Sequence, residues 1–266
     1  PGTDARIIVD LDDLLSLRYG RMLEQGKPPS AGRFASGGTR RIESAMRWFP
    51  GAGRGVLTAE RARIAALENR IVREADAVVM TSPVEARQLR AETRCGPKIV
   101  GIPPGFEVMS AVRMQRSGGK ATLGFFGNLD YGPNLESLEF LNTALAPMLE
   151  SNPGISLTIA GNCADPERLR KRLSRAVNFM GTVARPQEFY ESADIVLAPI
   201  FSGTGIRTKV LEAFAYGRPV IGTSMAFEGI ELPGLDRYRF ETLDDLLLRI
   251  RDLLQNWGDT VRDVQA

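Results

Sequence analysis

The sequence predicts an α/β protein with two Rossmann-like halves, of which the first is incomplete. Short apolar runs alternate with longer segments of helical periodicity, which is the pattern of βαβ units around a parallel sheet. The alternation is regular from Thr122 onward, but it yields only about three strands before that point. The composition is that of a folded domain, since 43% of the 266 residues are hydrophobic and 25% are charged.

Residues 1–115 form the predicted first domain. Strands are expected at 7–9, 77–81 and 99–102, and helices at 58–75 and from 83 to about 90. The second helix has a start signal, because Ser82 and Glu85 have the spacing of a capping box and Pro83 suits the first helical position. The stretch 20–56 is rich in glycine, serine and arginine and receives no assignment, and 109–120 reads as a polar linker.

Residues 116–266 form the predicted second domain, a complete doubly wound unit. Strands are expected at 122–126, 156–160, 178–180, 195–199 and 219–222, and helices at 134–149, 166–175, 186–192, 207–216 and 243–255. The last helix is expected to pack back on the junction of the two domains. Ligands bind at the carboxyl ends of the strands in such sheets, so the strand ends that carry glycine are the candidate binding loops.

Composition excludes several kinds of chemistry. The chain has no histidine, so it contains neither a Ser-His-Asp triad, nor a Cys-His pair, nor a His-ligated zinc site. Two widely separated cysteines fit a reducing compartment. No apolar run reaches the ~18 residues of a membrane span, and the first residues lack the order of a signal peptide. A cytoplasmic protein is predicted.

Five arginines cluster near the N-terminus: Arg33, Arg40, Arg41, Arg47 and Arg54. They predict contact with nucleic acid, peripheral contact with the anionic inner face of a membrane, or else a solvated basic face. The chain as a whole has 34 basic and 32 acidic residues, and its net charge of +2 argues against nucleic acid as a partner.

The segment from Gly203 to Gly217 carries the strongest chemical signal. It follows a predicted strand and opens a helix, so free backbone N–H groups and the positive end of the helix dipole are expected to meet there. Two glycines allow close approach of an anion. The residues of this predicted anion-binding turn are Gly203, Thr204, Gly205 and Ile206.

Charged residues follow within the same helix. Arg207 and Lys209 can add two positive charges to a bound diphosphate. Glu212 lies where a carboxylate can accept hydrogen bonds from a ribose diol, and Gly217 is expected to end the helix in left-handed geometry. The alternative is a glycine-bearing helix start with a solvated basic face.

Two other strand ends carry weaker signals. Gly127 and Asn128 close the first strand of this half, at a junction where α/β folds bind ligands. Gly181 could let a flat base lie against the backbone near Val183. Ordinary tight turns are the alternative at both places.

Together these motifs resemble the C-terminal domain of GT-B glycosyltransferases, in particular the retaining enzymes of the large family 4 group. The resemblance covers 121–232 and rests on Gly127-Asn128, Pro133-Asn134, Ala160-Gly161, Phe179 with Gly181, Ala193-Asp194 through Pro199, and GTGIRTKVLEAFAYGRPVI. It implies a GT-B-like fold and a nucleoside diphosphate sugar as donor. It also implies that Glu212 holds the ribose and that the loops at 127 and 203–206 face the diphosphate and the sugar.

Two positions depart from the commoner family pattern. Many relatives carry an acid eight residues before Glu212, where this chain has Thr204, and basic residues where it has Asn128 and Asn134. Arg207 and Lys209 are therefore predicted to supply the charge that stabilises the departing diphosphate, as catalytic groups. A polysaccharide-biosynthesis subgroup that this sequence resembles has the same arrangement.

The resemblance implies a retaining hexosyltransferase-type enzyme of polysaccharide or glycan synthesis. Its partners would be a nucleotide sugar and a glycan or lipid-linked acceptor, with no cofactor and no catalytic metal. Residues 1–108 resemble the second half of the N-terminal domain of such enzymes, where a strand ending in acids and an Arg-bearing helix start, here at Arg18 and Tyr19, precede a Ser-Pro-x-Glu helix, here at 82–85. The first domain is shorter than that whole domain. The chain would then be a fragment, and a fragment of this kind can bind the donor with or without activity.

Two alternatives remain open. Asp10 and Asp12 follow an apolar strand in the Asp-x-Asp pattern of haloacid dehalogenase-type magnesium phosphatases. A non-catalytic nucleotide-sugar-binding module is the other alternative, favoured by Thr204 at the acidic position and by the short first half.

Overall fold

The computed structural model describes residues 5–26, 50–95, 98–107 and 119–265. The chain divides into two compact units. The first comprises Pro1–Pro104 with Ser202–Ile206 and Glu228–Ile230, and the second comprises Gly105–Phe201, Arg207–Phe227 and Glu231–Ala266. Each unit contains a parallel β-sheet, which confirms the predicted α/β class.

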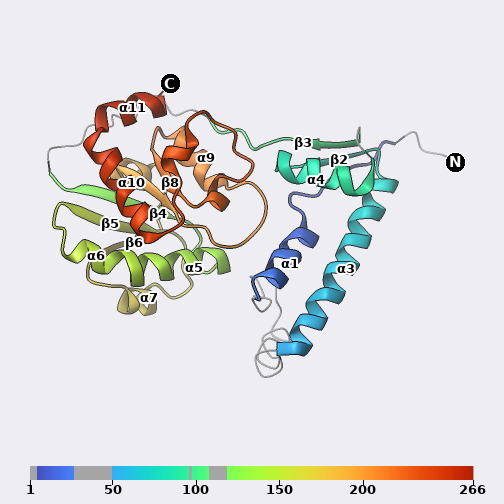
Figure 1. Ribbon diagram of the computed structural model, residues 1–266, viewed down its shortest axis with the longest axis horizontal. Coiled ribbons are helices and arrows are strands. Elements are labelled where there is room, and N and C mark those ends of the chain that lie inside the picture. The colour runs from blue at the N-terminus through green and yellow to red at the C-terminus, as the bar shows by residue number, and fades with distance from the viewer. Residues whose placement is uncertain (1–4, 27–49, 96–97, 108–118, 266) are drawn as a thin grey trace. The chain divides into compact units, whose positions relative to one another are not determined.

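The first unit is built on a three-stranded sheet of order β1-β2-β3 (Figure 1). Its strands are β1 (Ile8–Asp10), β2 (Ala77–Met80) and β3 (Ile99–Gly101), and its helices are α1 (Leu15–Glu24), α3 (Pro50–Glu74) and α4 (Pro83–Thr93). Val78, Met80 and Ile99 are fully buried and form a core with Val72 of α3 and Leu89 of α4. All three strands were predicted from their apolar runs.

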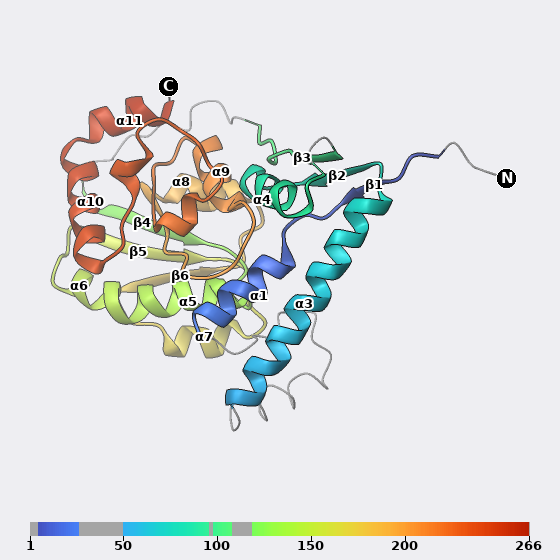
Figure 2. The same cartoon turned by 45° about the vertical axis from the view of Figure 1, so that its right-hand side comes forward.

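The helices of this unit extend the predictions at two places. The predicted helix 58–75 begins earlier, at Pro50, and α1 contains the helix start that the resemblance implies at Arg18 and Tyr19. No helical periodicity predicted the bounds of α1, whose buried residues are Ser16 and Gly20. Both views show α1 alongside α3 (Figure 2), and a Cβ on Gly20 would lie 3.3 Å from the Arg61 guanidinium of α3.

The second unit contains a five-stranded parallel sheet of order β6-β5-β4-β7-β8. Its strands are β4 (Ala121–Phe126), β5 (Ile155–Ala160), β6 (Val177–Gly181), β7 (Ile195–Ala198) and β8 (Val220–Gly222). The chain runs outward from β4 to β6, returns to β7 and continues to β8. The carboxyl ends of β4 and β7 therefore flank the point at which the strand order reverses, which is where open α/β sheets bind ligands.

Helices cover both faces of this sheet. They are α5 (Gly132–Phe140), α6 (Ala146–Glu150), α7 (Pro166–Arg172), α8 (Pro186–Ser192), α9 (Thr208–Ala215) and α10 (Leu243–Gln255). Figure 2 shows α5, α6 and α7 on one side of the strands and α8 and α9 on the other, as right-handed crossovers in opposite directions require. The complete doubly wound unit predicted for this half is confirmed.

One helix contains an irregular turn. The predicted helix 134–149 is a continuous helical stretch, but residues Leu141–Leu145 between α5 and α6 form a π-helix. The Ala146 N–H donates to the Leu141 carbonyl, five residues back. Leu141, Leu145 and Ala146 are all fully buried. The π turn therefore places apolar side chains of neighbouring turns on the buried face of the helix.

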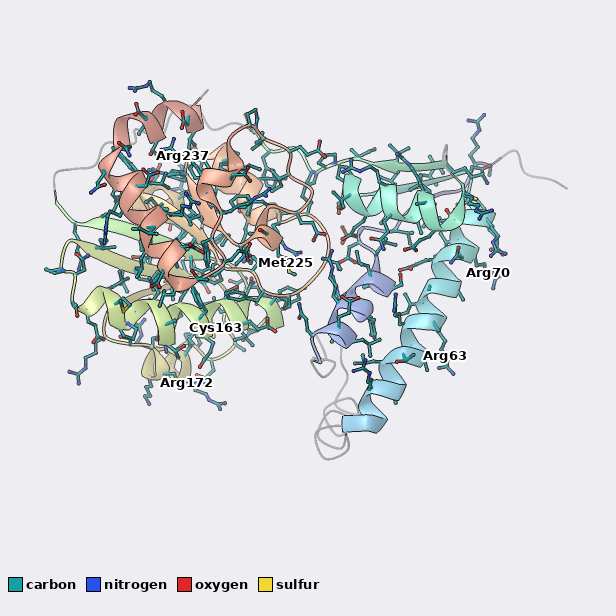
Figure 3. The ribbon with its side chains drawn as sticks, viewed as in Figure 1. Arg63, Arg70, Cys163, Arg172, Met225 and Arg237 are labelled. Atoms are coloured by element: carbon teal, nitrogen blue, oxygen red, sulfur yellow. The ribbon has the colours of Figure 1, made fainter. Side chains whose placement is uncertain are left out.

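The C-terminal helices are tied together by Arg237. It forms an ion pair with Asp263 of α11 (Trp257–Gln265) and lies 3.8 Å from the Asp252 carboxylate of α10 (Figure 3). The start of α10 is fixed by Thr242 and Asp245, which complete a capping box. Helix α11 was not predicted. The expectation that the 243–255 helix packs on the junction of the domains stays a prediction.

Of the predicted basic cluster, Arg54 is described and lies exposed on α3. Arg33, Arg40, Arg41 and Arg47 lie outside the described residues, so the predicted membrane contact is not tested. Arg63 and Arg70 of α3 pair with Glu60 and Glu74 on the same helix (Figure 3). In the described ranges, the helices are all too short or too polar to cross a bilayer.

Candidate functional site

The predicted site residues fall into both units. Gly127, Asn128, Gly181, Val183, Arg207, Lys209 and Glu212 belong to the second unit, and Gly203, Thr204, Gly205 and Ile206 to the first. In the second unit, the carboxyl ends of β4 and β6 and the first two turns of α9 carry them.

Lys209 reaches the loop after β4 from the first turn of α9. Its Nζ donates a 2.5 Å hydrogen bond to Asn134 Oδ1 and lies 4.7 Å from the centre of the Phe125 ring. A Cβ on Gly127 would lie 3.1 Å from the same nitrogen. The lysine thus brings a positive charge to the loop at Gly127 and Asn128, where the sequence has no basic residue.

The charge of Lys209 is held in an unfavourable environment. Parts of the side chain are accessible, but the nitrogen lies among Phe125 and Asn134, which are both buried. Burial, followed by the positive charge of Arg207, lowers the pKa of the Lys209 amine from 10.5 to about 7. An anion bound beside this nitrogen would offset both effects.

The loops after β4 and β5 approach each other closely. A Cβ on Gly161 would lie 1.7 Å from the Gly127 carbonyl oxygen, and Gly161 has φ of 144°. Asn134 Nδ2 donates to the Asn128 carbonyl at 2.8 Å, and the Asn128 side chain accepts from the Asp130 N–H at 3.0 Å. Asn128 and Asn134 therefore shape the loop that Lys209 contacts.

Arg207 stands at the N-cap position of α9, immediately before Thr208. It is half-buried and lies close enough to Lys209 to lower the pKa of the lysine. Two positive charges therefore gather at the start of this helix, where the helix dipole adds to them. The predicted helix end is confirmed, since Gly217 has φ of 65°.

Glu212 is held by a tyrosine that the sequence did not single out. The hydroxyl of Tyr190, on α8, donates a 2.9 Å hydrogen bond to Glu212 Oε2. Tyr190 is fully buried and Glu212 is half-buried. The two residues are 22 positions apart, and neither helix alone has a pattern that indicates the contact.

Gly181 ends β6 with φ of 74°, a conformation that favours glycine. Its carbonyl accepts from the Gly161 N–H at 2.8 Å, which links the ends of β5 and β6. A Cβ on Gly181 would meet no atom within 4 Å. The glycine is therefore explained by its backbone conformation, and the base-binding role of Gly181 and Val183 stays a prediction.

In the first unit, polar side chains hold the 202–206 loop. Arg21 of α1 donates to the Gly203 carbonyl at 2.9 Å and forms two hydrogen bonds with the Glu228 carboxylate, at 2.8 and 2.5 Å. The bond to Glu228 raises the pKa of Arg21. Thr204 is buried, and its Oγ1 bonds to Asp13 at 3.1 Å and accepts from Arg18 at 3.1 Å.

Glu85 corrects two expectations about this region. The Gly205 N–H, expected to be free for an anion, donates to Glu85 Oε1, and the Leu14 N–H donates to Glu85 Oε2 at 2.7 Å. Ser82 Oγ accepts from the Glu85 N–H as a capping box requires, but the carboxylate is used elsewhere. Burial raises the pKa of Glu85, and the two N–H donors oppose that shift.

The acids after β1 form local contacts. Asp10 accepts a hydrogen bond from the Asp12 N–H at 2.9 Å, and Asp12 has φ of 55°. Asp13 forms an ion pair with Arg18. These contacts account for the acidic run by turn geometry and ion pairing.

Sequence reasoning missed Tyr190, Arg21 and Glu228. Each acts through a contact with a residue far away in the chain, by 22 positions for Tyr190 and 207 for Arg21 with Glu228. Glu85 was noted only as a helix-capping residue. The sequence offered one signal, namely that these polar residues have apolar residues as their neighbours in the chain.

Comparison with known proteins gives the family. The family described as glycosyl transferases group 1 matches residues 120–256. A Klebsiella pneumoniae protein described as "Uncharacterized 44.6 kDa protein in cps region" is 33% identical over 114 residues, which are 40% of this chain and 29% of that protein.

Solved structures show the same fold. Anabaena Alr3699/HepE in complex with UDP matches with a TM-score of 0.59 and 18% identity, over 77% of this chain and 60% of that one. TarM of S. aureus matches with a TM-score of 0.57 and 14% identity, over 76% of this chain and 41% of that one. The chain spans less than two thirds of the length of each of these three relatives.

Proposed function

We propose that this chain, which belongs to the glycosyl transferases of group 1, transfers a sugar from a nucleoside diphosphate donor to a hydroxyl group of an acceptor. The second unit would bind the donor at the carboxyl edge of its sheet. Family membership favours this function over the phosphatase suggested by Asp10 and Asp12, whose local contacts need no catalytic role.

One observation carries the proposal. Two positive charges gather at the start of α9, and both burial and the charge of Arg207 lower the pKa of Lys209. Such a site is costly in the free protein, because burial and Arg207 both oppose protonation of the lysine. A diphosphate would offset that cost through charge-assisted hydrogen bonds. Strongly perturbed lysines at a sheet edge of this kind are typical of functional sites.

The proposed chemistry needs stabilisation of a leaving group. The bond between the anomeric carbon and the diphosphate breaks, and its electrons pass to the diphosphate oxygen. The acceptor hydroxyl oxygen bonds to the same carbon, and its proton passes to the departing phosphate. Arg207 and Lys209 would stabilise the charge that develops on the diphosphate, a contribution often worth about 3 kcal/mol for each preorganised donor.

The finer features of the function rest on likeness to relatives. The K. pneumoniae relative lies in a cps region, which supports an acceptor that is a glycan or a lipid-linked precursor of a polysaccharide. Another structure of HepE contains UDP-glucose, which supports a hexose donor. Retention of configuration, the absence of a metal or cofactor, and a cytoplasmic site of action complete the proposal.

Thermal-shift measurements with UDP, GDP, ADP and their sugars test the proposal on this chain. A matching nucleotide at about 100 times its Kd should stabilise the fold by about 2.7 kcal/mol. Transfer from the best donor to hydroxyl acceptors can then be followed by release of the nucleoside diphosphate. If none of the nucleotides or nucleotide sugars raises the melting temperature at millimolar concentration, donor binding is wrong.

Arg207→Ala is expected to weaken binding of the nucleoside diphosphate at least tenfold and to change binding of the nucleoside alone by less than about twofold. Tenfold corresponds to about 1.4 kcal/mol, the size of one charge-assisted contact. Isothermal titration with UDP and uridine, or the matching pair, measures both. Arg172→Ala, at the exposed end of α7 (Figure 3), controls for net charge. Equal losses for the two ligands would contradict a role on the diphosphate.

A further inference from the structure

Tyr190 and Glu212 form a buried pair beside the proposed donor site. The Tyr190 hydroxyl donates to Glu212 Oε2 at 2.9 Å, from α8 to α9. The tyrosine is fully buried, whereas the glutamate keeps part of its surface accessible. The hydrogen bond therefore joins a fully buried group to a residue that is partly accessible.

Aromatic rings hold Tyr190 in place. Its ring stacks on Tyr216 with centroids 4.6 Å apart and planes 17° apart. It meets the rings of Phe189 and Phe126 edge to face, at 5.1 and 5.8 Å. Rings in these arrangements are favourable contacts that restrict one another. The hydroxyl consequently has a fixed position relative to α9.

The pair can have only one direction of hydrogen bonding. Burial, and then the charge of Glu212, raise the pKa of the Tyr190 hydroxyl far above its ordinary value. The hydroxyl stays protonated and donates, and Glu212 Oε2 accepts. Rotation of the carboxylate would break this bond and leave a buried donor unsatisfied, which is unfavourable. The direction of Oε1 is therefore fixed as well.

We infer that Tyr190 is a positioning residue that directs Glu212 Oε1 to the ribose hydroxyls of the donor nucleotide and so makes the site select ribonucleotides over deoxyribonucleotides. This inference rests on the proposed function, because it needs a nucleotide at this edge of the sheet. A carboxylate oxygen with a fixed direction and two lone pairs can accept from the 2′- and 3′-hydroxyls together. A site built to bond a hydroxyl discriminates against a ligand that lacks it.

The test compares two ligands within each variant. The nucleoside diphosphate that stabilises the protein most among UDP, GDP and ADP is titrated beside its 2′-deoxy counterpart. The wild type is expected to bind the ribonucleotide at least tenfold more tightly. Tyr190→Phe should reduce this ratio to about threefold or less, because it removes only the hydroxyl that fixes the carboxylate. The Tyr190→Phe, Glu212→Gln double variant should show no lower ratio than Glu212→Gln alone.

Tyr216→Phe is the matched control, since it makes the same chemical change in the ring that stacks on Tyr190 and should keep the full ratio. A loss of stability weakens both ligands equally and leaves the ratio unchanged, so a purely structural role of Tyr190 would not move it. An unchanged ratio in Tyr190→Phe, or no discrimination in the wild type, overturns the inference while donor binding stands. If no nucleotide binds the wild type, the proposed function is wrong and the inference fails with it.

Discussion

Lys209→Met is expected to weaken binding of the nucleoside diphosphate about 100-fold or more. The variant removes a cation whose nitrogen lies at Asn134 and beside Gly127, while methionine has a similar length and suits the contact with Phe125. A hundredfold corresponds to about 2.7 kcal/mol, within the range for a hydrogen bond to a charged group. Isothermal titration of the wild type and the variant measures the change.

The same variant should abolish a proton uptake. The free lysine has a pKa of about 7, and a bound diphosphate would raise it, so binding at pH 8 should draw a proton onto Lys209. Affinity should then fall by up to about tenfold per unit as the pH rises above 7. Calorimetry at pH 8 in two buffers of different ionisation enthalpy gives the number of protons. Equal uptake in Lys209→Met, or an affinity of the wild type that does not vary between pH 7 and 9, contradicts the assignment.

Stability provides the control for this variant. Between about pH 7 and 10.5 the unfolded chain binds more protons at Lys209 than the folded chain, since the folded pKa is the lower one. Stability of the wild type should therefore rise with pH in that window, and this rise should be reduced in Lys209→Met. At pH 7 the variant should be at least as stable as the wild type, because a buried cation has been removed. Loss of binding would then not reflect loss of folding.

Gly161→Ala is expected to destabilise the protein by more than about 3 kcal/mol, as a large single-site effect. A Cβ at this position would lie 1.7 Å from the Gly127 carbonyl oxygen, so the loops after β4 and β5 would have to separate. The backbone φ of 144° adds strain to any other side chain. Chemical denaturation with urea gives the free energy of unfolding.

Gly217→Ala separates the two causes. Its φ is 65°, but a Cβ there would meet no atom within 4 Å. Conformational strain alone should therefore cost about 1 kcal/mol. The losses in free energy of unfolding should differ by at least about 2 kcal/mol between the two variants. This difference measures the cost of separating the two loops. If Gly161→Ala costs no more than Gly217→Ala, the loops are not in contact at that place.

Most of the fold could be predicted because its elements carry local signals. The eight strands of the described ranges are apolar runs, and the helices at 186–192 and 243–255 have clear boundaries, the second with a capping residue at Thr242. Apolar periodicity did not predict helix α1, whose buried residues are Ser16 and Gly20, and only the family resemblance indicated it. Local pattern predicts an element only when the buried face is apolar.

The site was predictable only in part, for a different reason. Arg207, Lys209 and Glu212 lie in one short motif, so the sequence could single them out. The contact of Lys209 with the loop at Gly127, and the low pKa that results, depend on packing between elements that are distant in the chain. The use of the Gly205 N–H by Glu85, 120 residues earlier, also depends on tertiary structure and overturned the expectation of a free donor.

The π-helix at Leu141–Leu145 bears on how this chain should be aligned with its relatives. A π turn is equivalent to an α-helix with one inserted residue. A relative that lacks this residue would have an unbroken α-helix and would still bury the counterparts of Leu138 and Leu149, which lie on either side of the turn. In a sequence alignment, a one-residue gap at 141–145 would therefore mark a change from π-helix to α-helix. It would not mean that the strands after the gap are shifted. Residue correspondences at the glycine loops after β5 and β6 and at α9 should be counted from β5 onward.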